Sequence, residues 1–266
     1  MSGMDRLGII GFGTMGEAFA TALRRKYPQL AITAFDVKPG RLAAAAAGLG
    51  IAVARDPASV AAESDLTLLC VKPQDIGTLM AGLAPRAKGR RFVSILAGTR
   101  IQRIAEGLGT QHVARFMPNI AAVAGRALVG VSFVPEAEPA FKAECLSVAA
   151  AFGTSLEIPE RLMAAMTGLS GSGLAYVFAF ADAMALGGVA AGFDYPTALK
   201  IAAEALESGA AMLKSVGTHP RELISRVASP AGTTIQGLRA LERGGFAAAV
   251  MEAVEAAARR AQELEG

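Results

Sequence analysis

The chain has 266 residues, of which 53% are hydrophobic and 18% are charged, and its formal net charge at pH 7 is +3. The composition excludes an intrinsically disordered chain, and the length suits one large domain or two modest ones. Acidic and basic residues are interleaved without a basic tract, so we expect no nucleic-acid partner.

The first expected element is an apolar strand over residues 7–10, followed by glycines with the spacing G-x-G-x-x-G and by a helical pattern. Gly11 permits a tight turn, Gly13 removes a Cβ from the path of a pyrophosphate, and Gly16 lets the helix pack on the strand. This context predicts a dinucleotide site, and the alternative is a glycine-rich turn without a ligand. The site would include Gly11, Phe12, Gly13, Thr14, Met15 and Gly16.

An acidic residue ends the second expected strand. A carboxylate at Asp36 would accept hydrogen bonds from the ribose hydroxyls of the cofactor and repel a 2′-phosphate, which favours NADH. Lys38 and Arg41 follow closely and suit a phosphate, which favours NADPH. The expected cofactor is therefore NADPH or NADH, with a lean to NADH from Asp36, and both Asp36 and Lys38 join the expected cofactor site.

Strand-like runs alternate with helical patterns through the first half of the chain. The expected strands cover residues 7–10, 31–35, 51–53, 66–71, 92–96, 113–116, 127–134 and 154–158. The expected helices cover residues 14–26, 41–47, 57–62, 74–83, 101–108 and 136–152. The alternation predicts an α/β Rossmann-type N-terminal domain over residues 1–159, with a doubly wound, mostly parallel sheet and a binding crevice at the carboxyl ends of its strands.

Three further segments follow expected strands and should reach this crevice. Val71, Lys72 and Pro73 form the first, although a solvated lysine at a strand end is the alternative. The turn at residues 97–99 is the second, and it contributes Ala97. The third contains Met117, Pro118 and Asn119; its asparagine offers a donor and an acceptor to a nicotinamide amide or to a substrate, and an ordinary turn is the alternative.

From about residue 160 the pattern changes to Ala/Leu/Met-rich helices separated by glycines. The expected helices cover residues 160–167, 173–191, 195–216, 220–225, 233–243 and 246–264. They predict an all-α C-terminal domain over residues 160–266. One stretch, residues 174–193, is nearly all apolar, with Asp182 as its only charge. Its length is near that of a membrane span, but a mid-span carboxylate is costly, so we expect burial between subunits and no membrane.

Two loops of small residues each precede one of these helices. The first contains Ser170, Gly171, Ser172 and Gly173, whose amides and hydroxyls at a helix N-terminus predict an anion site, a carboxylate above all. The second, residues 229–234, ends in Thr233 and Thr234, and capping alone explains only one of them. Both loops are therefore candidates for substrate contact.

Other chemistry-bearing residues are few. Cys70 and Cys145 each lie in an apolar segment and are expected to be free thiols in a reducing compartment. His112 and His219 are the only histidines, and no cluster has metal-ligand spacing, so no metal is expected. No signal-peptide pattern opens the chain, and the expected location is cytoplasmic.

Taken together, these segments resemble the Δ1-pyrroline-5-carboxylate reductase family over essentially the whole chain. The resemblance is carried by the glycine loop, Val71-Lys72-Pro73-Gln74, Met117-Pro118-Asn119, His219-Pro220, and the blocks over residues 169–176 and 229–234. It implies a homodimer through the C-terminal helices, with higher assembly left open, and a small cyclic imine carboxylate held between the two domains. The chain departs from the family pattern at Leu174, where proline is usual, at Ala231, where glycine is usual, and over residues 120–122.

The reaction so implied is hydride transfer from NAD(P)H to the carbon–nitrogen double bond of 1-pyrroline-5-carboxylate, which gives L-proline. A protonated cyclic imine already attracts hydride, so placement and electrostatics suffice without an obvious acid–base pair. In this hypothesis the amides of residues 170–173 and the Ser172 hydroxyl hold the carboxylate, catalytic Thr234 hydrogen-bonds the ring nitrogen, and Thr233 supports its loop. Three alternatives are a related cyclic-imine reductase, a 3-hydroxyacid dehydrogenase-like enzyme, for which Val177 replaces the needed lysine, and a non-catalytic nucleotide sensor.

Overall fold

A computed structural model describes residues 4–265, which form two compact units. The first unit runs to Gly171 and also contains the chain from Ala256 onward, and the second covers Ser172–Glu255. The domain boundary expected from the sequence, after residue 159, falls where strands give way to helices and stays a prediction. The chain therefore leaves the first unit and comes back to it, which the sequence pattern did not indicate.

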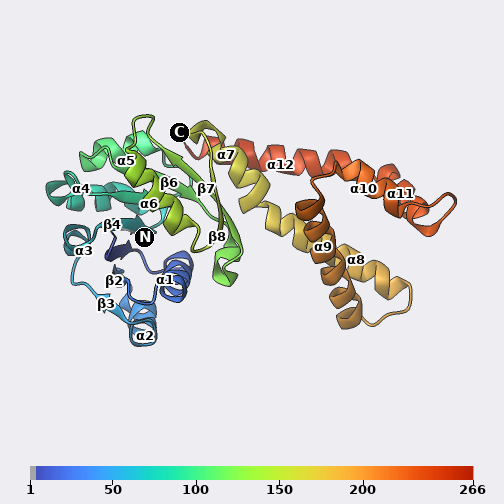
Figure 1. The fold of residues 1–266 in the computed structure, drawn as a ribbon, viewed down its shortest axis with the longest axis horizontal. Helices are drawn as coiled ribbons and strands as arrows, with labels where there is room; N and C mark the ends of the chain where they lie inside the picture. Colours follow the sequence, from blue (N-terminus) through green and yellow to red (C-terminus); the bar gives the residue numbers. More distant parts are fainter. Residues whose placement is uncertain (1–3, 266) are drawn as a thin grey trace. The chain divides into compact units, whose positions relative to one another are not determined.

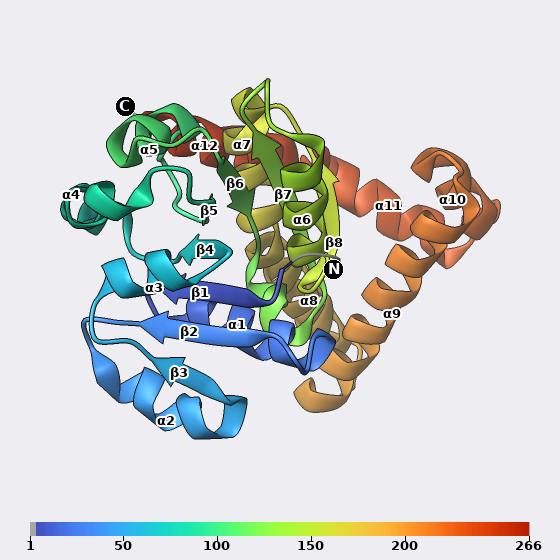
Figure 2. The same cartoon turned by 60° about the vertical axis from the view of Figure 1, so that its left-hand side comes forward.

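Within the described residues, the first unit is built on one sheet of eight strands in the order β3-β2-β1-β4-β5-β6-β7-β8. Neighbouring strands are parallel except β6 and β7, which are antiparallel. The expected doubly wound, mostly parallel Rossmann-type sheet is confirmed (Figure 1; Figure 2). The strands are β1 (Arg6–Ile10), β2 (Ala31–Phe35), β3 (Ile51–Val53), β4 (Leu66–Leu69), β5 (Phe92–Ser94), β6 (Val113–Met117), β7 (Ala127–Phe133) and β8 (Gly153–Glu157).

Helices cover both faces of this sheet, and each face buries its own apolar core. One core contains Phe19, Leu42 and Phe141 from α1, α2 and α6, and the other contains Val60, Leu83 and Ile104 from α3, α4 and α5. Strand residues alternate between the two, since Ile9 belongs to the first core and Ile10 to the second. The helices are α1 (Thr14–Lys26), α2 (Pro39–Leu49), α3 (Pro57–Glu63), α4 (Ile76–Ala87), α5 (Ile101–Leu108) and α6 (Pro139–Ala149), with short turns η1 (Pro73–Asp75) and η2 (Ile120–Ala124).

Two sequence-based expectations about helices were wrong. The helix expected over residues 136–152 is shorter, because Pro139 occupies the first turn of α6 and the chain leaves the helix at Ala150. The helix expected over residues 160–167 is mixed: η3 (Glu160–Leu162) is a 3₁₀ turn, α7 (Met163–Met166) is one α-helical turn, and η4 (Thr167–Gly171) is π-helical. Periodicity does not distinguish these forms over so few residues.

The second unit, as far as the structure describes it, is helical. Helices α8 and α9 pack closely, since a Cβ added at Gly188 would lie 2.9 Å from the Cβ of Ala198. The Tyr195 hydroxyl donates a hydrogen bond to Asp182 Oδ1 at 2.7 Å, so the one charge of the apolar stretch has a polar partner on the next helix. The helices are α8 (Gly173–Ala190), α9 (Tyr195–Val216), α10 (Pro220–Val227), α11 (Thr233–Arg243) and α12 (Phe246–Glu263), the last ending in the first unit.

Helix α8 leaves much of its apolar surface uncovered within the chain. Phe178 and Leu186 on α8, and Phe193 shortly after it, are each at least half exposed. The helical segment Glu160–Ala190 is long and apolar enough, by length and composition, to cross a membrane. An apolar surface of this extent indicates a partner rather than free solvent, and its burial between subunits stays a prediction.

Candidate active site

The glycine loop between β1 and α1 has the backbone that its sequence predicts. Gly11 has φ of 95°, and a Cβ there would lie 2.6 Å from the carbonyl carbon of Cys70. A Cβ on Gly16 would run into the carbonyl oxygen of Gly11, so close helix–strand packing also needs a glycine. Gly13 faces open space, and no side chain caps the helix that starts after it. The first amides of α1 are thus available to an anion.

Asp36 at the end of β2 holds this loop in place. Its Oδ2 accepts a hydrogen bond from the amide of Phe12, and its Oδ1 accepts one from the amide of Lys38 at 2.7 Å. The carboxylate therefore braces two loops before any ligand is present, and it has lone pairs left for a ribose hydroxyl. Nearby, Arg41 donates a hydrogen bond to the Thr14 hydroxyl at 3.1 Å and lies 3.7 Å from Glu17.

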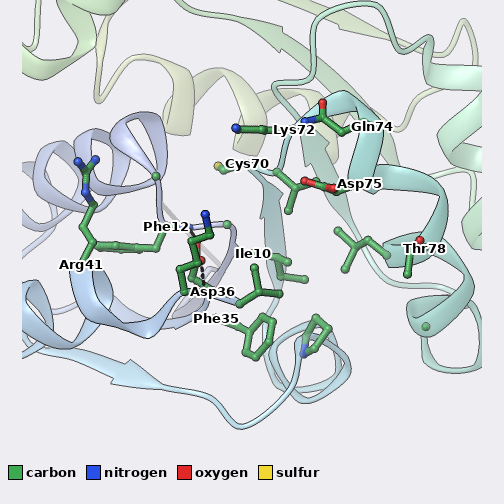
Figure 3. A pocket seen from close by; sticks show the side chains of 18 of the residues that line it. Ile10, Phe12, Phe35, Asp36, Arg41, Cys70, Lys72, Gln74, Asp75 and Thr78 are labelled. Carbon is green, nitrogen blue, oxygen red and sulfur yellow. Dashed lines mark hydrogen bonds between the residues drawn. The ribbon is translucent and has the colours of Figure 1, made fainter.

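A cavity of about 940 Å³ opens at the carboxyl ends of β1, β2 and β4 (Figure 3). Its volume suits a large cofactor. The expected cofactor residues that line it are Gly11, Phe12, Gly13, Asp36, Lys38, Val71 and Lys72. Among the described lining residues, three basic side chains (Lys38, Arg41, Lys72) face two carboxylates (Asp36, Asp75), a balance that favours an anionic ligand.

One wall of this cavity was missed by the sequence reasoning. It comes from η1 and α4, and Figure 3 shows Gln74, Asp75 and Thr78 across the cavity from Asp36. Gln74, Thr78 and Gly82 are spaced by four residues, which places them on one helical face. This face of polar and small residues lies opposite the buried Ile76 and Leu83. It was the feature of the sequence that could have indicated this wall.

Cys70 lies at the cavity wall directly after β4 and is a free thiol, as is Cys145. Burial raises the pKa of the Cys70 thiol well above its usual range, so the sulfur stays protonated at neutral pH. A protonated thiol is a poor nucleophile, and its position beside the glycine loop indicates a packing role. The lining residues thus favour binding and orientation of a ligand over covalent chemistry.

The other expected cofactor residues lie outside the lining of this cavity. Thr14, Met15 and Gly16 belong to α1, Pro73 opens η1, and Ala97 is exposed in the turn after β5. Met117 ends β6, and Pro118 and Asn119 follow it, both buried. The structure therefore brings together the residues after β1, β2 and β4, and it leaves those after β5 and β6 on the next strands of the same sheet edge.

Asn119 ties its strand exit to the first of the two small-residue loops. Its Nδ2 donates a hydrogen bond to Ser170 Oγ at 3.1 Å, and its Oδ1 accepts one from the amide of Ala121 at 3.2 Å. These two bonds fix the orientation of the amide. A Cβ on Gly171 would lie 3.4 Å from Cε of Met117, so the same strand exit also packs against the next residue of the loop.

The expectation that Ser170–Gly173 forms the free N-terminus of a helix was wrong. Helical structure is continuous through this stretch, because η4 precedes Ser172 and α8 follows it. The amides at Gly171, Ser172 and Gly173 therefore lie inside a helical segment rather than at its open end. A π-helical turn widens the backbone by one residue and is frequent at functional sites, so small residues here still allow close approach.

The second small-residue loop lies in the other unit and opens α11. Gly232 is its N-cap residue without a side-chain cap, and Thr233 and Thr234 form the first turn. Ala231 has φ of 58°, the one non-glycine residue with positive φ among residues 4–265. This loop therefore holds a backbone conformation that normally requires glycine, and strain of this kind concentrates at functional sites.

Comparison with known proteins decides the family. Residues 160–264 match the family model described as pyrroline-5-carboxylate reductase dimerisation, and residues 6–98 match the model described as NADP oxidoreductase coenzyme F420-dependent. The pyrroline-5-carboxylate reductase of Methanosarcina acetivorans is 40% identical to the chain over 98% of both sequences. The chain belongs to the pyrroline-5-carboxylate reductase family.

Solved structures agree with this family assignment. The 1-pyrroline-5-carboxylate reductase of Streptococcus pyogenes is 28% identical, with a TM-score of 0.87 over 97% of this chain and 98% of that one. The pyrroline carboxylate reductase of Plasmodium falciparum, solved with NADP bound, shares the fold at 23% identity, with a TM-score of 0.89 over the full length of both chains.

Family membership confirms the reductase among the functions considered from the sequence. Pyrroline-5-carboxylate reductases are NAD(P)-dependent oxidoreductases that act on an imine. The glycine loop, the braced Asp36 and the cavity of the first unit fit such a dinucleotide. The lean to NADH and the roles of individual substrate residues stay predictions.

Proposed function

We propose that this chain reduces 1-pyrroline-5-carboxylate to L-proline with NADPH or NADH. The observation that carries the proposal is the glycine loop, braced by Asp36 and opening on a cavity of about 940 Å³, in a chain of the pyrroline-5-carboxylate reductase family. When bound, NAD(P)H supplies the hydride to the carbon of the C=N bond. The chain's own residues supply binding, orientation and electrostatics.

On the cofactor side, the open amides at the start of α1 bind the pyrophosphate and the bare backbone at Gly13 lets it approach. Asp36 fixes the loop and accepts a hydrogen bond from a ribose hydroxyl, which favours NADH. Lys38 and Arg41 could instead pair with the 2′-phosphate of NADPH. Asp36 is the reason that NADH is favoured here, whereas the NADP bound to the Plasmodium falciparum relative supports NADPH.

On the substrate side, the hydroxyls of Ser170 and Ser172 bind the carboxylate, and Gly171 and Gly173 leave room for it to approach. Asn119 orients Ser170 through the 3.1 Å hydrogen bond. Thr234 hydrogen-bonds the ring nitrogen, and Thr233 supports the same loop. A ring that arrives protonated needs no general acid. The cavity of the first unit is assigned to binding the cofactor.

The exposed apolar faces of α8 and the other C-terminal helices are proposed as the interface of a homodimer. The match of residues 160–264 to the dimerisation model and the exposure of Phe178, Leu186 and Phe193 support it. Burial of these faces between subunits in place of a membrane, and a cytoplasmic location, belong to the same proposal.

The role of Thr234 is tested by Thr234→Ala. Loss of one hydrogen bond to the ring nitrogen should lower kcat/KM for the imine by about 1–2 kcal/mol, roughly five- to thirtyfold, with the affinity for NAD(P)H unchanged. Steady-state kinetics measure the first and fluorescence titration the second. Thr234→Ser keeps the hydroxyl and is the matched control. Equal kinetics for wild type and Thr234→Ala would remove Thr234 from the mechanism.

A further inference from the structure

The chain buries an arginine in the sheet that the proposed reaction does not use. Arg115, on β6, is 1% exposed, although its guanidinium is charged at every physiological pH. Its Nη2 lies 2.7 Å from Glu265 Oε1, and its Nη1 lies 3.4 Å from Glu160 Oε1. Its Nε has no hydrogen-bond partner among the residues that the structure describes. A buried cation with so few partners depends on both carboxylates to stay in place.

Each carboxylate also touches the segment that follows β5. Glu160 Oε1 accepts a hydrogen bond at 2.7 Å from the amide of Ile101, the first residue of α5. Glu265 Oε2 lies 3.7 Å from Nε of Arg100. The two acidic side chains are 105 residues apart in the sequence, one beginning the helical segment that leaves the first unit and one following α12 after its return. Arg115 joins them beneath a single loop.

The backbone of that loop lies close to Leu264, the residue before Glu265. Gly98 has φ of 71°, and a Cβ there would lie 2.5 Å from the carbonyl oxygen of Leu264. Residues 264 and 265 thus form the back of the turn that contains Ala97 and Gly98. This turn follows the carboxyl end of β5, next to β4 and on the sheet edge where the cavity opens.

We propose that Arg115, Glu160 and Glu265 form a clamp that positions the loop of residues 97–100 for cofactor binding. The proposal rests on the proposed function, since it assigns these residues to the cofactor side of that site. They are positioning residues, because they act through the loop and Arg115 lies inside the sheet. Leu264 and Glu265, at least 248 positions beyond the glycine loop of residues 11–16, then contribute to affinity for the dinucleotide.

The first test replaces one charge of the clamp. Glu265→Gln keeps the size of the side chain and leaves Glu160 as the only carboxylate on Arg115. The expected result is a Kd for NAD(P)H, from fluorescence titration, raised about three- to tenfold, with the KM of the imine at saturating cofactor unchanged. Glu263→Gln is the matched control, because Glu263 is exposed and pairs with Arg260. It should change neither quantity.

The second test does not depend on the stability of one variant. Gly98→Ala and a chain ending at Glu263 are each expected to weaken cofactor binding, and their combination should weaken it by less than the product of the two effects. The strain of a positive φ at residue 98 is present in both backgrounds and cancels in this comparison. What remains is the contact with the Leu264 carbonyl.

The outcomes separate this proposal from the proposed function. Wild-type protein that binds NAD(P)H and turns over the imine, together with a Kd for Glu265→Gln equal to that of Glu263→Gln, would overturn the clamp alone. So would a lowered melting temperature without a change in cofactor affinity, or independent effects of Gly98→Ala and the shortened chain. Wild-type protein that neither binds cofactor nor turns over imine would overturn the proposed function instead.

Discussion

Single glycines set how closely a ligand can approach the sheet edge. Gly11 and Gly16 are required by the fold, because a Cβ at either would meet backbone atoms. Gly13 differs, because its φ is −76° and a Cβ there would meet nothing within 4 Å. Its side of the loop faces the cavity. We therefore expect that the absence of a side chain at residue 13 matters for a ligand in the cavity and not for the stability of the fold.

Gly13→Ala is expected to separate binding from stability. The added methyl group should leave the melting temperature unchanged and raise the Kd for NAD(P)H at least about tenfold, since it occupies the path of the pyrophosphate. Gly77→Ala is the matched control, because Gly77 also has open space around its Cα but does not line the cavity. Fluorescence titration and thermal unfolding of both variants give the answer. Equal Kd values for the two variants would contradict the assignment.

The sequence predicted which residues gather at this edge better than what each one does. The glycine spacing and Asp36 were read from their positions, and both lie at the cavity. That Asp36 would bind the amides of Phe12 and Lys38 depends on the distance between two loops, which spacing along the chain does not contain. The positive φ of Ala231 explains why glycine is usual at that position in the family. This φ angle, like the hydrogen bonds of Asp36, is visible only in the structure.

At the scale of elements, the strands and most helices follow directly from apolar periodicity. The strand boundaries agree within about two residues because buried parallel strands are short apolar runs bounded by turns. Residues 160–171 escaped this reasoning, since α-helical, 3₁₀ and π-helical turns share the same composition there. The cavity wall formed by α4 was also missed. The polar face of this helix points to a site only once the buried face of the helix is known.

The start of β1 is held by one carboxylate, which gives the fold a testable dependence on pH. Asp65 accepts hydrogen bonds from the amides of Asp5 and Arg6 and from the Arg6 guanidinium at 2.8 Å. Burial alone would raise the pKa of Asp65, but these hydrogen bonds outweigh it and hold the pKa below its usual range. A carboxyl with a lowered folded pKa stabilises the fold above its unfolded pKa and loses that effect as the pH falls through the folded value.

Asp65→Asn should therefore lower the free energy of unfolding by about 1 kcal/mol at pH 7. The difference between wild type and variant should shrink below about pH 4, where the wild-type carboxyl also becomes protonated in the unfolded chain and then in the folded one. Urea unfolding at pH 7 and at pH 3.5 measures it. Asp5→Asn is the control, because it keeps both the Asp65 carboxylate and the hydrogen bond that the Asp5 amide donates to it. A difference that stays constant across this range would contradict the role of the carboxylate.

At the scale of the whole molecule, the chain exposes more apolar helix surface than a monomer in water is expected to keep. The sequence predicted this from the composition of residues 174–193 but not which faces stay open, because that depends on how α9 packs on α8. Phe178, at 62% exposure, is among the most exposed large side chains of α8. It is therefore a direct probe of the proposed interface.

Phe178→Asp should convert the proposed dimer to monomer, since it places a charge in an apolar contact. Light scattering coupled to size-exclusion chromatography measures the mass. Glu222→Gln is the control, because Glu222 is exposed on α10 and pairs with Arg226 in its own helix. A dimer that survives Phe178→Asp unchanged would place the interface elsewhere.

The reductase assignment itself depends on turnover by the wild-type protein. The direct measurement is the oxidation of NADPH and of NADH at 340 nm, with 1-pyrroline-5-carboxylate and with its six-membered homologue. We expect cofactor oxidation that requires an imine, with L-proline formed from 1-pyrroline-5-carboxylate in an amount equal to the cofactor oxidised. The ratio of kcat/KM for NADPH to kcat/KM for NADH decides between the carboxylate of Asp36 and the cations at Lys38 and Arg41. Protein that binds the cofactor but consumes neither form of it with either imine would contradict the reductase assignment.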